Sequence, residues 1–472
     1  MRRLMALIIG GALAATASSY AQAQQNVTVA DRTALALTIY GNGLALVKDR
    51  RRAELPIGIN ELSLSGVSPQ MIADSLELGF SKPVRLLSRT LRPANLNPRS
   101  LLEAHIGKTV ELIRTHPETG VEMSIAATPI SVANGVIARI GTKLVTNPAG
   151  RWAFPAIPDH LRAKAALVVG LESAAAGQHD IDIRYLSGGL SWRAAYTANW
   201  DRRARTLKLA AWAALQNSTA MHFDAARVSL VAGQVRRVSS PRRAMPDRAL
   251  RMKLQAEMED SSGAVAVREA LAGYHLYELP QTLTLRPGEE AQAALMTPFA
   301  VNVRRELVSE SHPAVFSRVR GGAKQPSHPA IRLSFENPKS DTAQPLPAGT
   351  VRLYGPDSSG AQQFLGEDRV GDIPIGDDVK LNAGKAFDVR VFRHQSDFRR
   401  QDRNKFEAAY EIVLVNGGTK VETVKIVEAV PGDWRLMDSD QPHTRENNQA
   451  VWRITVPAKG KAGFTYRVAV RN

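Results

Sequence analysis

Residues 185–200, YLSGGLSWRAAYTANW, alternate between apolar and small or polar side chains after a pair of glycines. This period of two predicts a half-buried β-strand that follows a turn at the glycines. The aromatic side chains of its apolar face have two interpretations, a hydrophobic core, which we favour, or an exposed platform for a ligand. The residues that we single out as a structural signature of the fold are Gly189, Leu190, Trp192, Tyr196 and Trp200.

The same alternation recurs along most of the chain. Residues 35–55 contain two alternating runs on either side of the turn sequence Gly41-Asn42-Gly43, which predicts a hairpin. Residues 107–147 contain about five short apolar runs separated by turn sequences, and this density favours a small barrel. From residue 274 to residue 470, alternating runs follow one another at the spacing of immunoglobulin-like sandwiches. We therefore expect an all-β fold of several antiparallel domains.

These patterns divide the chain into four parts. We expect a leader peptide at 1–23, an N-terminal β-region at 24–160 with the small barrel at 105–155, a central β-sandwich at 161–310 and a C-terminal β-sandwich at 311–472. Residues 235–272 interrupt the central sandwich, because the alternation is lost there and arginine, alanine and glutamate become frequent. This composition predicts a flexible basic loop with a short helix.

The first residues have the order of a secretory signal peptide. Arg2 and Arg3 precede an apolar run that ends near Ala15, and small and polar residues follow up to an A-Q-A step that ends at Ala23. We therefore expect cleavage after Ala23 and a periplasmic or secreted protein. For the route of export we favour the general pathway, and the twin-arginine pathway that Arg2 and Arg3 could also indicate remains open. An uncleaved N-terminal anchor is the alternative, although the run is short for a membrane span.

The balance of charged residues is basic, with 61 Lys and Arg against 45 Asp and Glu and a formal net charge of +16 at pH 7. A positive field raises the local concentration of anionic molecules, so an anionic polymer or a protein of the envelope is the expected partner, and nucleic acid is not expected. The charge is equally compatible with a simple gain in solubility. The absence of cysteine excludes disulfides and thiolate sites. We expect no transmembrane segment after removal of the leader.

Catalytic and metal-binding motifs are weakly represented. The sequence contains neither G-x-S-x-G nor H-E-x-x-H. Asp180 and Asp182 fall on one face of a predicted strand, where they could bind a hard cation or, as we favour, face water. Together with Glu367, they are the candidate acids of a hydrolase with paired carboxylates. We assign no catalytic, cofactor-binding or metal-binding residue and expect no cofactor.

Two stretches concentrate positive charge, one at 393–405 and a denser one inside the predicted basic loop. Arginines of such a loop could bind phosphate or carboxylate groups through paired N–H donors, or they could simply face solvent. The candidate residues for binding an anionic partner are Arg236, Arg237, Arg242, Arg243, Arg248, Arg251 and Lys253.

An ordered series of motifs resembles a bacterial family. Gly189-Leu190-Ser191-Trp192 with Tyr196 is followed by LQNS at 215–218, LVAG at 230–233, PLPAGTVRLYGPD at 345–357 and VPGDW at 430–434. The series is similar to the family catalogued as domain of unknown function 4139, which is related to mucoidy-inhibitor-A-like proteins. The resemblance covers roughly residues 30 to 471 and implies a β-rich envelope protein with a signal peptide. It brings no catalytic residues, and the long coiled-coil segment of many mucoidy-type relatives is missing.

Three classes of function remain open at this point. The first, which we favour, is an exported, non-catalytic β-sandwich protein that binds an envelope polymer or a protein partner. The second is a hydrolase that acts on envelope glycans or peptides. The third is a structural or assembly protein that pairs with a partner strand at a sheet edge.

Overall fold

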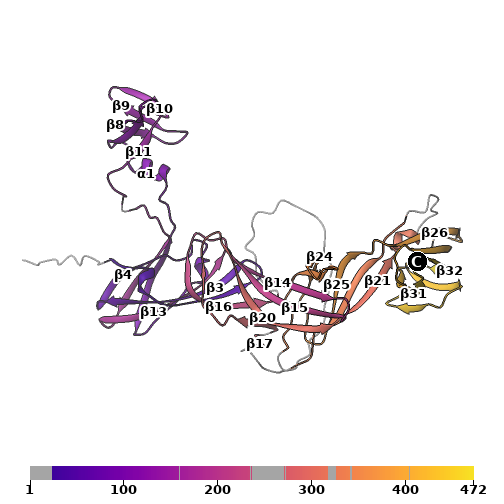
Figure 1. Ribbon diagram of the computed structural model, residues 1–472. Coiled ribbons are helices and arrows are strands. Elements are labelled where there is room, and N and C mark those ends of the chain that lie inside the picture. Colours follow the sequence, from indigo (N-terminus) through magenta and orange to yellow (C-terminus); the bar gives the residue numbers. More distant parts are fainter. Residues whose placement is uncertain are drawn as a thin grey trace, which may run out of the picture. The chain divides into compact units, whose positions relative to one another are not determined.

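A computed structural model describes residues 24–158, 160–233, 235, 270–271, 273–316, 326–340, 343–402 and 404–471. Nearly every regular element in these ranges is a β-strand, so the predicted all-β fold is confirmed (Figure 1). The chain divides into two compact units. Unit 1 comprises Met1–Leu37, Leu46–Gly188 and Ser218–Ala226, and unit 2 comprises Thr38–Ala45, Gly189–Asn217 and Arg227–Asn472.

The strands that lie wholly or partly in unit 1 are β1 (Gln24–Val27), β2 (Arg32–Tyr40), β3 (Leu44–Leu55), β4 (Gly58–Ser65), β5 (Glu77–Phe80), β6 (Val84–Arg92), β7 (Val110–Thr115), β8 (Glu122–Ser131), β9 (Ile137–Ile140), β10 (Lys143–Thr146), β11 (Arg151–Ala153), β12 (Ala166–Ser173), β13 (Gly177–Gly188) and β16 (Phe223–Ala232). Its helices are α1 (Pro98–Ala104) and the short 3₁₀ helices η1 (Val29–Asp31) and η2 (Ala73–Ser75). The boundary between the units falls within β2, β3 and β16. The predicted hairpin is confirmed, because β2 and β3 flank the turn at residues 41–43 and are neighbours in one sheet.

Two sheets lie wholly within unit 1. The first has the strand order β1-β4-β12-β6, with β1 parallel to β4 and β12 antiparallel to both of its neighbours. The second, at the place of the predicted small barrel (105–155), has the order β10-β9-β8-β7-β11. The barrel prediction was wrong: the strands were counted correctly, but β10 and β11 are the two edges of an open antiparallel sheet. Closure would require these two edge strands to pair with each other.

The strands of unit 2 are β14 (Leu190–Asp201), β15 (Thr206–Asn217), β17 (Ala270–Leu271), β18 (Tyr274–Glu278), β19 (Leu283–Leu285), β20 (Glu290–Asn302), β21 (Arg304–Glu310), β22 (Ala330–Glu336), β23 (Gly349–Pro356), β24 (Gln362–Val370), β25 (Asp378–Lys385), β26 (Val389–Arg400), β27 (Lys405–Asn416), β28 (Glu422–Glu428), β29 (Asp433–Ser439), β30 (Thr444–Glu446), β31 (Gln449–Val456) and β32 (Lys461–Arg471), with the 3₁₀ helix η3 (Pro313–Phe316).

Three sheets organise unit 2. A five-stranded sheet has the order β20-β15-β14-β23-β24, in which β14 is the central strand. A six-stranded sheet, β25-β22-β21-β28-β31-β30, and a four-stranded sheet, β26-β27-β32-β29, enclose a shared core around Trp452 and Tyr466. These two sheets form a β-sandwich, because both contribute buried side chains to the same hydrophobic cluster.

A buried ion cluster joins the β2–β3 hairpin to the sheet of β1, β4, β12 and β6. The Asp49 carboxylate on β3 accepts hydrogen bonds from Arg32 on β2 at 2.9 Å and from Arg51 on β3 at 2.8 Å. The Arg51 side chain is fully buried and also donates to the backbone oxygens of Val27 at 3.2 Å and of Ser65 at 2.6 Å. Arg51 thereby attaches β3 to β1 and to the end of β4. Each charge is matched and hydrogen-bonded, which is the condition under which buried ions are tolerated.

The environment of Asp49 makes the stability of unit 1 depend on pH. Burial by itself would raise the pKa of Asp49, but the hydrogen bonds and positive charges of Arg32 and Arg51 outweigh it and hold the pKa below its ordinary value of 3.8. A carboxyl group with a depressed pKa in the folded state stabilises the fold fully above its unfolded pKa. This contribution is lost as the pH falls through the folded-state pKa.

We expect Asp49→Asn to lower the free energy of unfolding at pH 7 by about 3 to 5 kcal/mol, because it leaves the buried Arg51 without a counter-charge. Urea unfolding at pH 7 and pH 3 measures this, and the difference between variant and wild type should shrink at the lower pH. The control is Asp182→Asn, which removes an exposed ion pair with Arg50 and should change little. Equal effects of the two substitutions would contradict the role of the buried cluster.

Candidate functional site

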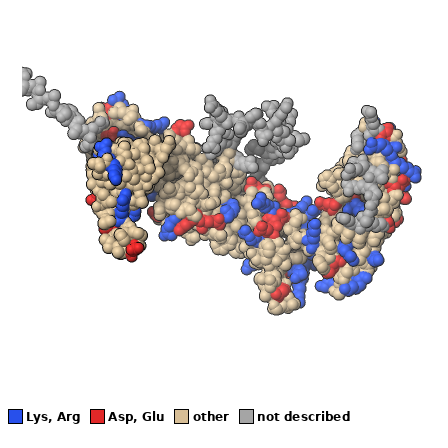
Figure 2. All heavy atoms as spheres, turned by 90° about the horizontal axis from the view of Figure 1, so that it is seen from above, with Lys and Arg blue, Asp and Glu red and all other residues tan. Residues whose placement is uncertain are grey.

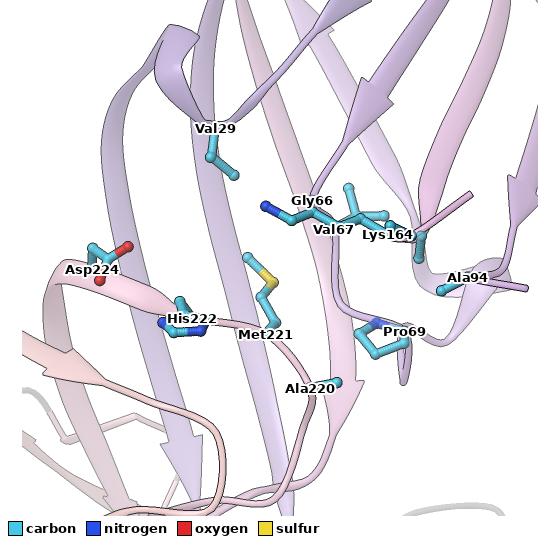
Figure 3. Close-up of a pocket in the computed structure, with 12 residues that line it drawn as sticks. Val29, Gly66, Val67, Pro69, Ala94, Lys164, Ala220, Met221, His222 and Asp224 are labelled. Carbon is cyan, nitrogen blue, oxygen red and sulfur yellow. The ribbon is translucent and has the colours of Figure 1, made fainter. Parts of the chain in front are cut away.

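A pocket of about 370 Å³ opens in unit 1. Its apolar lining includes Val29, Val67, Pro69 and Met221, together with several alanines. Its polar side chains are Lys164, His222 and Asp224. In Figure 3 the Lys164 side chain extends across the pocket, with its amine toward the side lined by Val29 and Met221. The volume and the mixture of an apolar wall with a few polar groups are typical of small-molecule sites.

The wall of this pocket is held in place by the buried ion cluster. Gly66 lines the pocket, its N–H donates to the Ala165 oxygen at 3.0 Å, and its oxygen accepts from Arg51 at 3.4 Å. Gly66 has a φ of +71°, and a Cβ at this position would come within 2.7 Å of the Val29 side chain. Only glycine fits this backbone conformation and this contact without strain. The part of the pocket wall at Gly66 is therefore fixed by the fold of unit 1.

The three polar side chains of the pocket are available to a ligand. Lys164, His222 and Asp224 are exposed, and within the described ranges none of them makes a hydrogen bond or an ion pair. His222 directly precedes β16 and Asp224 is the second residue of this strand, and the two alternate with the buried Met221 and Phe223. None of these residues was predicted from the sequence, because the pocket is assembled from separate segments and the segments carry no motif.

The carboxylates singled out from the sequence are paired with arginines. Asp182 accepts from Arg50 at 2.7 Å and Asp180 from Arg52 at 3.0 Å, both between β13 and β3 on an exposed face. Glu367 belongs to the other unit, where it lies 3.4 Å from Arg352. The structure thus gives each of these acids a cation as its partner. In the part of the chain that is described, no group of three or more His, Asp or Glu side chains could hold a metal ion.

Of the two basic stretches singled out from the sequence, the structure describes only the one at 393–405, apart from residue 403. The candidate residues Arg236, Arg237, Arg242, Arg243, Arg248, Arg251 and Lys253 lie outside the described residues, and so does the predicted helix of this loop. In the stretch at 393–405, Arg393 pairs with the buried Glu428 at 2.8 Å and Arg399 with Asp397 at 3.0 Å. On the face shown in Figure 2, cationic and acidic side chains are intermixed. Two arginines of the second stretch are thus paired with carboxylates.

The edge strand β6 bears on the hypothesis of assembly through sheet edges. β6 pairs only with β12 in its sheet, and most of its residues are exposed. However, a β-bulge interrupts the pairing next to Leu86, and Arg85, Arg89 and Arg92 follow its length. Bulges and charged side chains are features by which proteins prevent an edge strand from pairing with another chain.

Three motifs of the family resemblance meet around β14. The predicted alternation is confirmed, since Leu190, Trp192, Tyr196 and Trp200 are all buried. Gly189, at φ +80°, precedes the strand. The Trp192 Nε1 donates to the Val231 oxygen at 3.1 Å, in the LVAG motif, and the Tyr196 hydroxyl donates to the Pro347 oxygen at 2.6 Å, in the PLPAG motif. Burial raises the pKa of Tyr196 far above its ordinary value, so the hydroxyl remains a donor.

Gly349 completes this junction. β23 runs parallel to β14, and a Cβ at Gly349 would lie 2.3 Å from the Ala194 oxygen. The glycine of the PLPAG motif is therefore required for the two backbones to approach. The GLSW, LVAG and PLPAG motifs lie far apart in the sequence. Together they attach β16 and β23 to β14.

A family model described as Domain of unknown function (DUF4139) matches residues 181–472. The chain belongs to this family. The DUF4139 match begins within β13 and includes all of β14 and the three motifs that meet there. Comparison of the chain with curated proteins gives no match. Among the helices that the structure describes, none has both the length and the apolar character needed to cross a membrane.

The position of Trp192 in the DUF4139 region leads to a stability prediction. We expect Trp192→Ala to lower the free energy of unfolding by about 3 to 5 kcal/mol, because it empties a large core site and removes the hydrogen bond to Val231. Thermal and urea unfolding measure the loss. Trp212→Ala is the matched control, since Trp212 on β15 is 42% exposed and should contribute much less. A Trp192→Ala melting curve that coincides with the wild-type curve would show that the ring is no part of the core.

Proposed function

We propose that this protein is an exported binding protein of the cell envelope, and that its pocket in unit 1 takes an amphipathic anion. The observation that carries this proposal is the largely apolar pocket with Lys164 unpaired across it. The leader sequence supports export to the envelope. The basic net charge supports a ligand with negative charge.

The chemistry of the lining defines the ligand class. An apolar tail would be removed from water against Val67 and Met221, which stabilises the complex by roughly 25 cal/mol per Å² of buried surface. An anionic head group, carboxylate or phosphate, would pair with Lys164 and accept a hydrogen bond from His222. Asp224 offsets part of the positive charge, so a single anionic group fits better than a polyanion. Molecules with these two parts are common constituents of envelopes.

The test uses titration calorimetry of the mature chain with decanoate and with decyl phosphate as probes. We expect both anions to bind, and decanol and decyltrimethylammonium to bind at least tenfold more weakly, because they lack the group that pairs with Lys164. Comparing decanoate with decyl phosphate distinguishes a carboxylate ligand from a phosphate ligand.

Two variants connect this binding to the pocket. Lys164→Glu should weaken the binding of both anions at least tenfold, whereas the matched control Lys108→Glu, at an exposed lysine outside the pocket, should leave it unchanged. Ala163→Trp at the exposed rim should block binding of all probes by filling the space. The proposal is wrong if none of the probes binds, or if Lys164→Glu binds the anions as well as Lys108→Glu does.

A further inference from the structure

Among the described residues, the five-stranded sheet of unit 2 presents an uncovered face that neither the family motifs nor the unit 1 pocket explains. Its inner face carries Trp192, Tyr196 and Leu209, which are buried. The side chains between them point to the opposite side. We call this side the outer sheet face and define it by Trp212, Ala195, Thr350, Arg369, Thr197, Arg352, Glu367, Lys208, Asn199, Tyr354 and Phe364.

The strand registers order this face into rows across the sheet. One row runs from Trp212 on β15 through Ala195 on β14 and Thr350 on β23 to Arg369 on β24. The row four residues along β14 places Lys208, Asn199, Tyr354 and Phe364 side by side. Neighbouring strands lie about 4.8 Å apart and residues about 3.3 Å apart along a strand, so the two rows are separated by about 13 Å and each spans about 14 Å.

Trp212 is the unusual residue of the first row. Its side chain is 42% exposed, although it stands on an inner strand of the sheet with partners on both sides. Its cross-strand neighbours are Ala195 and Ala294, and Thr350 follows beyond Ala195. Because these neighbouring side chains are small, they leave the indole ring exposed, and a flat apolar ring can lie against it. At the other end of the face, Tyr354 and the exposed Phe364 are in edge contact, with ring centroids 5.7 Å apart.

The charges of the outer sheet face are unbalanced. Arg352 is matched by Glu367 at 3.4 Å, and at the border of the face Arg193 is matched by Glu290 at 2.8 Å. The side chains of Lys208 and Arg369 are exposed and have no carboxylate partner in the described ranges. The face therefore carries two uncompensated cations, one in each row, on either side of the neutral polar groups of Thr197 and Asn199.

We propose that the outer sheet face binds a chain of acidic polysaccharide. The apolar face of one sugar ring stacks on Trp212, and the chain continues over the floor of Ala195 and Thr197 toward Tyr354 and Phe364. Carboxylates of the sugars pair with Lys208 and Arg369, and the planar guanidinium of Arg369 can hold a carboxylate through two N–H donors. Sugar hydroxyls take hydrogen bonds from Asn199, Thr197 and Thr350. Aromatic stacking and paired charges fit this occupant together, whereas a neutral glycan would leave both cations unused.

Binding of polygalacturonate, a linear polymer of sugar acids, to the whole mature chain tests this inference. Affinity electrophoresis or calorimetry should show binding of polygalacturonate that weakens as salt rises, and at least tenfold weaker binding of neutral dextran. Trp212→Ala should weaken polygalacturonate binding at least tenfold, and Trp212→Phe should restore part of it. Arg369→Ala and Lys208→Ala should each weaken it several-fold and reduce its salt dependence.

Matched controls separate this face from the rest of the chain. Phe387→Ala removes an aromatic side chain that is 88% exposed elsewhere in unit 2, and Lys385→Ala removes an exposed cation of β25; neither should change binding. Melting curves confirm that the variants are folded. Lys164→Glu should also bind polygalacturonate normally, which distinguishes this face from the unit 1 pocket.

Three results would overturn the inference. Unchanged binding by Trp212→Ala would exclude stacking on this ring. Dextran binding as tight as that of polygalacturonate would exclude an acidic chain. A change in oligomeric state on substitution of Trp212, measured by sedimentation velocity, would show that the face contacts a second protein instead.

Discussion

The strand β14 contributes side chains to both faces of its sheet, one buried in the core of unit 2 and one exposed. The core and the outer sheet face therefore both depend on its sequence. Its inward side chains are large, and two of them donate hydrogen bonds to backbone oxygens of β16 and of the segment before β23. Its outward side chains are small or polar, so they leave a flat floor beside Trp212. Because successive side chains of a strand point to opposite sides, the order of residues along one strand determines both the core and the outer sheet face.

The alternation of side chains was sufficient to predict the strands but, apart from the hairpin of β2 and β3, not their partners. The hairpin at residues 41–43 and the buried face of β14 follow from local sequence, since a period of two is a property of the strand itself. The open edges of the small sheet and the parallel pairing of β14 with β23 do not, because they depend on contacts between distant segments. For the same reason the outer sheet face was not predicted, although each of its residues is visible in the sequence.

The buried ion cluster, the helix α1 and the unit 1 pocket were not predicted either, each for a different physical reason. Residues 48–52 read Lys-Asp-Arg-Arg-Arg, and composition alone cannot show that Asp49 and Arg51 are buried while their neighbours point to the other face. The helix α1 was missed, although Asn97 followed by Pro98 is a recognisable start: the Asn97 side chain accepts from the Ser100 N–H at 3.0 Å. The unit 1 pocket had no such signal, because Lys164 and His222 come together only through the fold.

We propose that this protein engages anionic components of the envelope. Co-sedimentation of the mature chain with washed envelope fractions, over a series from low to physiological salt, tests it most directly. We expect the protein to pellet with the envelope at low salt and to move into the supernatant as salt rises, because screening weakens the attraction between exposed charges. A protein that stays in the supernatant at every salt concentration would contradict the claim.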